Sequence, residues 1–292
     1  MINASPWIVD ETLHSPLFEP LRYWLERIDP ARFPDLPELN ALLAAGPAVA
    51  TQRGLPVRFV AQQTGRQEFA AQYEPRCYLT GEVQTRSNNL HDLFNALVWR
   101  AFPGSKAALN ARHYQALSQT GQPPDGGRGQ VRDMATLFDE SGVIVASAES
   151  ELSGLLADFR WKELFWHARE RVRANMGFYI FGHGLYEKAM HPYLGMTGQG
   201  LVVQVDTAFF SWPLADRLQH LDEQVAAYFS DAAHCRETRE LTPVPLLGVP
   251  GWTPENELET YYENRDYFRP GRRGRVPGRP AQGELTRLRK GR

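Results

Sequence analysis

Residues 85–113, TRSNNLHDLFNALVWRAFPGSKAALNARH, predict two consecutive helices that carry many polar side chains. Either Asn88 or Asn89 can cap the first helix, since an asparagine side-chain oxygen accepts an otherwise unpaired backbone N–H. Trp99 lies opposite the apolar face, which indicates a helix covered on most of its sides. The apolar face repeats with the helical period of 3.6 residues and comprises Leu90, Leu93, Phe94, Leu97, Val98 and Ala101.

A break at residues 102–104 separates the two helices, because Pro103 disfavours helical geometry in the residue before it. Ser105 is expected to cap the second helix. If the two helices pack side by side as a hairpin, five polar side chains from both of them can converge. These are His91, Asn95, Lys106, Asn110 and His113.

Two interpretations of this polar group remain open. Burying each such group without a partner would cost about 1–3 kcal/mol, so the groups must bond to one another, to the backbone or to a ligand. A structural hydrogen-bond network satisfies this requirement, and so does a functional pocket. The pocket hypothesis assigns catalytic roles to His91, Asn95 and His113, and substrate binding to Lys106 and Asn110.

A second group of polar residues falls in residues 178–191, which we predict to form a helix ended by a proline. His183, Glu187 and His191 follow one another at intervals of four residues. Two histidines eight residues apart are separated by about 12 Å along a straight helix, so one ion cannot bind all three side chains. A solvated helix face is the alternative to a site.

A shared site would draw on both groups. His183 and Glu187 can meet on neighbouring turns, and with His91 they form our candidate set for a divalent metal ion; His183 and Glu187 also join the catalytic candidates. Two glycines, Gly182 and Gly184, flank His183 and permit close approach of another part of the backbone.

The composition describes a globular protein. The chain has 292 residues, 42% of them hydrophobic, and a net charge of −2. We predict one globular domain over residues 1–270 and a basic, disordered tail over residues 271–292, which could contact an anionic polymer. With two cysteines and no apolar run long enough to span a membrane, neither a disulfide framework nor a membrane span is expected. Without a secretory signal, the expected location is the cytoplasm.

The predicted fold class is α+β, a helix-dominated single domain with a small antiparallel sheet and an irregular C-terminal segment. The sheet is expected to include a hairpin over residues 134–147, in which Asp139 and Gly142 occupy the turn. Residues 149–173 and 214–229 predict further helices. Strands are predicted at 56–62 and 201–206, short helices near 17–28 and 37–45, a helix or a strand at 68–79, a flexible loop at 121–129, and an irregular surface segment at 242–270.

Several stretches together resemble a bacterial family named only as domain of unknown function 3025. They include NNLHDLFNALVWRAFP (88–103), KAALNARH (106–113), RDMATLFDESG (132–142) and GHGLYEK (182–188), with PLLGVPGWTPEN and YFRP near the end. The resemblance covers residues 16–270 and implies a soluble bacterial protein. It carries no established catalytic residues.

The sequence therefore leaves two alternative functions open. The first is a hydrolase for a small molecule, assisted by a divalent metal, in which a histidine–carboxylate pair supplies metal ligands or a general base. The second is a non-enzymatic binding or scaffold protein, in which the histidines and asparagines form a structural network. Phosphate-loop, nucleophile-elbow, HExxH and CxxC motifs are all missing from the sequence.

Overall fold

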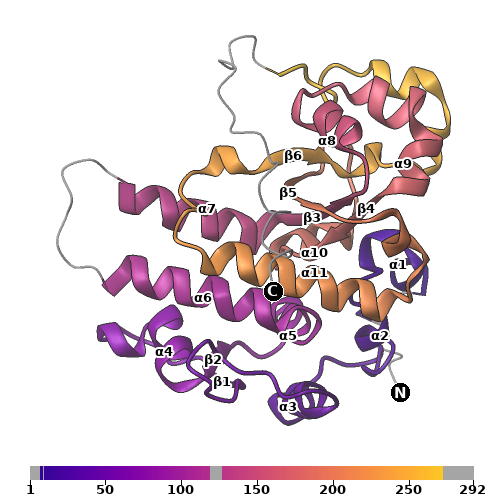
Figure 1. The fold of residues 1–292 in the computed structure, drawn as a ribbon. Helices are drawn as coiled ribbons and strands as arrows, with labels where there is room; N and C mark the ends of the chain where they lie inside the picture. Colours follow the sequence, from indigo (N-terminus) through magenta and orange to yellow (C-terminus); the bar gives the residue numbers. More distant parts are fainter. Residues whose placement is uncertain (1–6, 9, 119–126, 272–292) are drawn as a thin grey trace.

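A four-stranded mixed sheet lies between two groups of helices in the computed structural model, which describes residues 7–8, 10–118 and 127–271 (Figure 1). Its strand order is β4-β3-β5-β6, with β3 parallel to β5 and the other pairs antiparallel. The strands are β3 (Gly142–Ser147), β4 (Met176–Ile180), β5 (Thr197–Gln204) and β6 (Thr242–Pro245). The α+β, helix-dominated class is confirmed, but the sheet is mixed rather than antiparallel.

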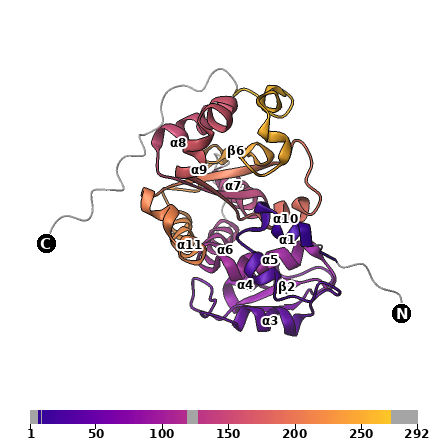
Figure 2. The same ribbon diagram turned by 90° about the vertical axis from the view of Figure 1, so that its right-hand side faces the viewer.

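Helices cover both faces of this sheet. Helix α11 lies on one side, and α8, α9 and the C-terminal segment lie on the other (Figures 1 and 2). All six residues of β3 are buried as a result. The helices are α1 (Asp10–His14), α2 (Arg22–Leu25), α3 (Leu36–Ala44), α4 (Tyr73–Thr80), α5 (Leu90–Ala101), α6 (Pro103–Ser118), α7 (Gly127–Ser141), α8 (Ser150–Ala157), α9 (Arg169–Asn175), α10 (His183–Ala189) and α11 (Leu214–Ser230).

The predicted hairpin over residues 134–147 is wrong in its first half. Residues 127–141 form helix α7, and only residues 142–147 form a strand. Met134, Ala135 and Phe138 are fully buried, and their spacing of one, three and four residues is that of a helix face. Asp139 and Glu140 therefore lie in the last turn of a helix, not in a β-turn.

The predicted helix over residues 178–191 is also wrong in its first half, because residues 176–180 form strand β4 and the helix begins at His183. Phe178, Tyr179 and Ile180 are all buried. A strand buried on both faces lacks the alternation that distinguishes a strand from a buried helix.

The helix predicted over residues 149–173 is interrupted. Helix α8 ends at Ala157, and Phe159 adopts a positive φ of 60°, which no helix interior tolerates. A π-helical turn over Glu163–His167 then leads into α9. Three short helical pieces therefore replace one long helix.

Several other predictions are confirmed. Helix α3 and helix α11 fall where short and long helices were expected, and residues 58–61 form strand β1 (Arg58–Ala61), which pairs in parallel with β2 (Glu82–Thr85). The ambiguous stretch at 68–79 contains helix α4. Of the irregular C-terminal segment, residues 242–245 join the sheet as β6.

Two predicted segments fall largely outside the described residues. The loop at 121–129 is described only from residue 127, where α7 begins, and the basic tail is described only at residue 271. Among the described helices, none is long and apolar enough to cross a membrane.

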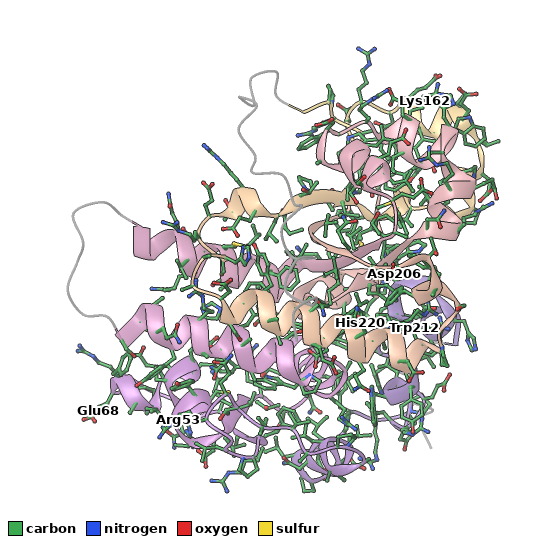
Figure 3. All side chains as sticks on the ribbon, viewed as in Figure 1. Arg53, Glu68, Lys162, Asp206, Trp212 and His220 are labelled. Atoms are coloured by element: carbon green, nitrogen blue, oxygen red, sulfur yellow. The ribbon has the colours of Figure 1, made fainter. Side chains whose placement is uncertain are left out.

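Helix α11 is anchored at the surface by aromatic contacts. His220 on this helix lies against Trp212 and Phe209, with ring centroids 5.5 and 5.9 Å away (Figure 3). Phe209 lies within the 3-10 turn Thr207–Ser211, and Trp212 directly follows it. This turn connects β5 to α11. The contacts hold the second turn of α11 against that connecting segment.

Helix α5 has the cap that the sequence predicted, whereas α6 does not. The Asn89 side chain accepts a hydrogen bond from the backbone N–H of Asp92 at 3.0 Å. Helix α6 already begins at Pro103, and its first free N–H groups, on Gly104 and Ser105, donate to the carboxylate of Asp222 at 2.8 and 2.7 Å. A carboxylate from α11 thus caps α6, a partner that local sequence cannot reveal.

Replacing Asp222 with alanine is expected to lower the free energy of unfolding by about 1–3 kcal/mol, because two backbone N–H groups and the Ser105 hydroxyl lose a buried acceptor. Urea denaturation measures this change. Glu223→Ala, at the exposed neighbouring position, serves as the control. Equal stability of the two variants would contradict the capping role.

Aromatic pairs in the core hold together the helices that carry the candidate site. Phe94 on α5 stacks on Tyr186 on α10 with ring centroids 5.7 Å apart. Phe138 on α7 stacks on Phe181, two residues before α10, at 4.9 Å. All four rings are buried. The start of α5, the end of α7 and the start of α10 are thereby fixed relative to one another.

Candidate metal centre

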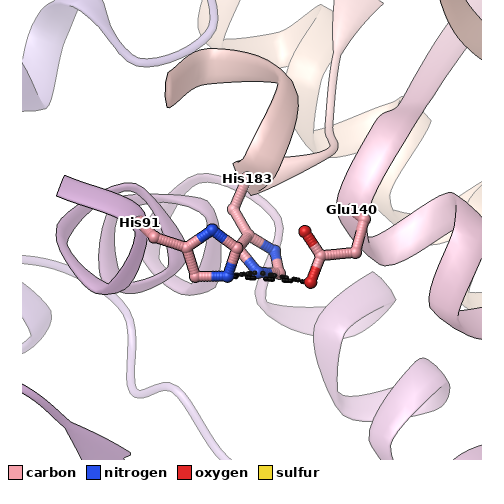
Figure 4. A group of neighbouring side chains, drawn as sticks. All are labelled: His91, Glu140 and His183. Atoms are coloured by element: carbon pink, nitrogen blue, oxygen red, sulfur yellow. Dashed lines mark hydrogen bonds and ion pairs between the residues drawn. The ribbon is translucent and has the colours of Figure 1, made fainter. Parts of the chain in front are cut away.

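Three side chains from three helices point toward one another at this junction (Figure 4). His91 lies in the first turn of α5, Glu140 in the last turn of α7, and His183 is the first residue of α10. Each offers one ligand atom, and these atoms lie within 4.8 Å of one another. The rings of His91 and His183, distant in sequence, therefore face the same point.

The three separations are short and nearly equal. The Nε2 atoms of His91 and His183 lie 3.0 Å apart. The Oε1 atom of Glu140 lies 3.6 Å from Nε2 of His91 and 3.5 Å from Nε2 of His183. One oxygen and two imidazole nitrogens thus form a nearly equilateral triangle.

This triangle is close to the coordination geometry of zinc: the two separations that involve Glu140 fit it, and the one between the two Nε2 atoms is shorter. Zinc bonds to histidine nitrogen and carboxylate oxygen are about 2.0–2.2 Å long, so a tetrahedral ion holds its ligand atoms about 3.3–3.6 Å apart. A circle through the three observed atoms has a radius of about 2.0 Å. His91, Glu140 and His183 would together hold such an ion.

Both histidines turn their other ring nitrogen toward a carboxylate. The Nδ1 atom of His91 lies 3.3 Å from Oε2 of Glu187, and the Nδ1 atom of His183 lies 3.8 Å from Oδ2 of Asp139. A carboxylate beside Nδ1 favours a proton on that nitrogen when a metal takes the Nε2 lone pair; without a metal, the hydrogen bond between the two Nε2 atoms requires a proton on one of them. Metal-binding histidines in proteins commonly have such partners.

The carboxylates of Glu140 and Asp139 are ionised at neutral pH. Burial would raise the pKa of Glu140, but its contact with Nε2 of His183 and the proximity of His91 lower it below the ordinary value. Burial would likewise raise the pKa of Asp139, yet the charges of Lys106 and His183 and the hydrogen bond from Lys106 lower it to about 2. Negative charge is therefore available to compensate for a bound cation.

One side of the triangle is open to solvent. The side chains of His91 and Glu140 are 28% and 41% exposed, whereas that of His183 is 6% exposed. A cation could enter from the exposed side, and a fourth coordination position would remain there. Three protein ligands with one open position characterise catalytic rather than structural zinc sites.

The two glycines beside His183 have the role that the sequence predicted, since both lie against the end of α7. A Cβ atom on Gly182 would lie 2.5 Å from the backbone nitrogens of Ser141 and Gly142. A Cβ atom on Gly184 would lie 2.5 Å from Oε2 of Glu140. The close approach that brings His183 to Glu140 therefore requires small residues at both positions.

The remaining predicted site residues lie deeper than the triangle. The Asn95 amide donates to the Tyr73 hydroxyl at 2.7 Å, and the Asn110 amide donates to Glu74 at 2.6 Å. His113, with Lys106 and Asn110, lines a cavity of about 10 Å³, which is large enough for only about one water molecule. Asn95 and Asn110 thus tie the helices together, and a catalytic or substrate-binding role for them stays a prediction.

Of the three residues predicted to bind a metal, His91 and His183 lie at the triangle and Glu187 does not. Glu187 lies on the Nδ1 side of His91, away from the triangle, and Glu140 occupies the third corner. Sequence reasoning missed Glu140 and Asp139 because residues 139–142, Asp-Glu-Ser-Gly, have the composition of a β-turn. The helical spacing of Met134, Ala135 and Phe138 is the signal that could have placed them on a helix end.

The comparisons with known proteins yield a family and no activity. A protein-family model described as "Protein of unknown function (DUF3025)" matches residues 57–272, and the chain therefore belongs to that family. No curated protein and no solved structure matches the chain. All the residues that surround the triangle lie within the matched region.

Proposed function

We propose that this DUF3025 protein binds a single divalent transition-metal ion, most favourably zinc, through His91, Glu140 and His183, and that it acts as a metal-assisted hydrolase. The observation that carries the proposal is the triangle of two imidazole nitrogens and one carboxylate oxygen at zinc-ligand spacing. Two nitrogens and one oxygen also suit zinc better than magnesium or calcium, which prefer oxygen ligands alone.

The hydrolytic part of the proposal follows from the number of ligands and from their exposure. A zinc ion with three protein ligands binds a water molecule in the fourth position and lowers its pKa to about 7, so that hydroxide forms at neutral pH. Glu140 and His91 border the open side, where a substrate would have to approach. Glu187, on the Nδ1 side of His91, could accept a proton from that ring during the reaction.

Elemental analysis after removal and return of metal tests the proposal. The chain, stripped with a chelator and then dialysed against zinc, is expected to retain one zinc ion per molecule. The loaded protein is expected to release p-nitrophenol from p-nitrophenyl acetate or bis(p-nitrophenyl) phosphate faster than the stripped protein. Glu140→Gln should lose both properties, because the amide is a poor zinc ligand.

The experiment tests zinc binding and hydrolysis separately. Retention of zinc without turnover of either ester would remove the hydrolase and keep the metal site. Failure to retain zinc would remove both and would favour the structural network as the role of the histidines.

A further inference from the structure

The buried ion pair behind His183 is a second feature of this junction. Nζ of Lys106 on α6 donates to Oδ1 of Asp139 on α7 at 2.6 Å. The Lys106 side chain is 5% exposed and that of Asp139 is 15% exposed. Taking both charges out of water costs several kcal/mol per ion by order of magnitude, so the pair is not explained by stability alone.

Among the described residues, none forms a hydrogen bond with His183 on the side that faces this pair. Its Nδ1 atom is buried and makes no hydrogen bond within the described part of the chain. The nearest carboxylate atom recorded for it is Oδ2 of Asp139 at 3.8 Å, which is slightly longer than a hydrogen bond. An unpartnered ring nitrogen thus faces the free oxygen of a carboxylate whose other oxygen is held by Lys106.

The corresponding carboxylate of His91 differs in its surroundings. Glu187 lies 3.3 Å from Nδ1 of His91, but its side chain is 48% exposed, and water can replace it as acceptor. Water cannot easily replace Asp139 behind His183, because both side chains are largely buried. Asp139 should therefore contribute more to the orientation of His183 than Glu187 contributes to that of His91.

We infer that Asp139, fixed by Lys106, is a positioning residue that holds the His183 ring with its proton on Nδ1 and its Nε2 lone pair directed at the metal position. The inference rests on the proposed metal site. A shift of a few tenths of an ångström closes the 3.8 Å gap to a hydrogen bond, and the partial positive charge that a cation places on the ring strengthens that bond. Lys106 then keeps Asp139 from turning away.

Asp139→Asn is the most informative variant. Lysine can only donate hydrogen bonds, so the asparagine must present its oxygen to Lys106. Its NH₂ group then faces His183 and cannot accept a proton from Nδ1. The variant preserves shape but replaces the acceptor by a donor, which drives the His183 proton to Nε2, the nitrogen needed for the metal.

Zinc affinity, measured by competition with a chromophoric chelator, should fall about 10- to 100-fold in Asp139→Asn. Glu187→Gln is the matched control, for which we expect about a fivefold loss or less, as for an exposed ion pair. Equal losses in the two variants, or a change of less than twofold in Asp139→Asn, would overturn the inference.

Nitrogen-15 NMR of the histidine rings provides a readout that does not depend on zinc. In the zinc-free wild type, His183 should carry its proton on Nδ1, and in Asp139→Asn on Nε2. A wild-type ring protonated on Nε2 alone would overturn the inference even if the variant fails to fold. Because this measurement needs no metal, failure of the proposed function and failure of the positioning role remain distinguishable.

Discussion

Replacing His183 with alanine, or Glu140 with glutamine, is expected to weaken zinc binding by about 100-fold or more. Loss of a group that merely supports a ligand already costs about 10- to 100-fold, and these two residues would contact the ion directly. With either one removed, two ligands remain, and the triangle of 3.0, 3.5 and 3.6 Å no longer exists. Calorimetric titration with zinc measures the change.

His191→Ala is the matched control for this experiment. His191 follows α10, is exposed, and lies eight residues after His183. Its replacement should leave the affinity unchanged. If His191→Ala loses as much affinity as His183→Ala, zinc binds to exposed histidines at the surface and not at the junction of α5, α7 and α10.

Lys106→Met is expected to lower the free energy of unfolding by about 3–5 kcal/mol, the usual cost of breaking a buried ion pair from one side. The Asp139 carboxylate would then be left largely buried without its cation, and the contact of Lys106 with the face of Trp99, 5.7 Å from the ring centroid, would be lost as well. Urea denaturation of the zinc-free protein measures this loss without a contribution from metal binding.

The double variant Lys106→Met with Asp139→Asn separates the cost of an unpaired buried charge from the cost of lost packing in the free energy of unfolding. Without a buried carboxylate, it should be more stable than Lys106→Met alone. A loss of less than about 1 kcal/mol in Lys106→Met would mean that water reaches the pair as it reaches a surface ion pair, and that Asp139 is not held in place by Lys106.

The sequence predicts the structural frame of the site where the signals are local. Asn89 and the repeat of apolar residues define α5, and the long amphipathic pattern defines α11. Gly182 and Gly184 predict that another part of the backbone approaches closely beside His183, and the end of α7 does so. Each of these features depends on residues within a few positions of one another.

The parts that the sequence does not predict depend on distant partners or on ambiguous composition. Residues 139–142 have turn-forming side chains, yet the buried face of α7 carries the helix to Ser141. The carboxylate of Asp222 caps a helix more than a hundred residues away. The convergence of His91 with His183, and the entry of Glu140 between them, follows from the packing of α5, α7 and α10 and not from any spacing along the chain.

Crystals of the full chain soaked in zinc, with anomalous data collected at the zinc edge, show whether an ion binds at the junction of α5, α7 and α10. A single strong peak is expected about 2.0–2.2 Å from Nε2 of His91, Nε2 of His183 and Oε1 of Glu140. The absence of a peak between these three atoms, with the histidine rings still facing each other, would contradict the proposed metal centre.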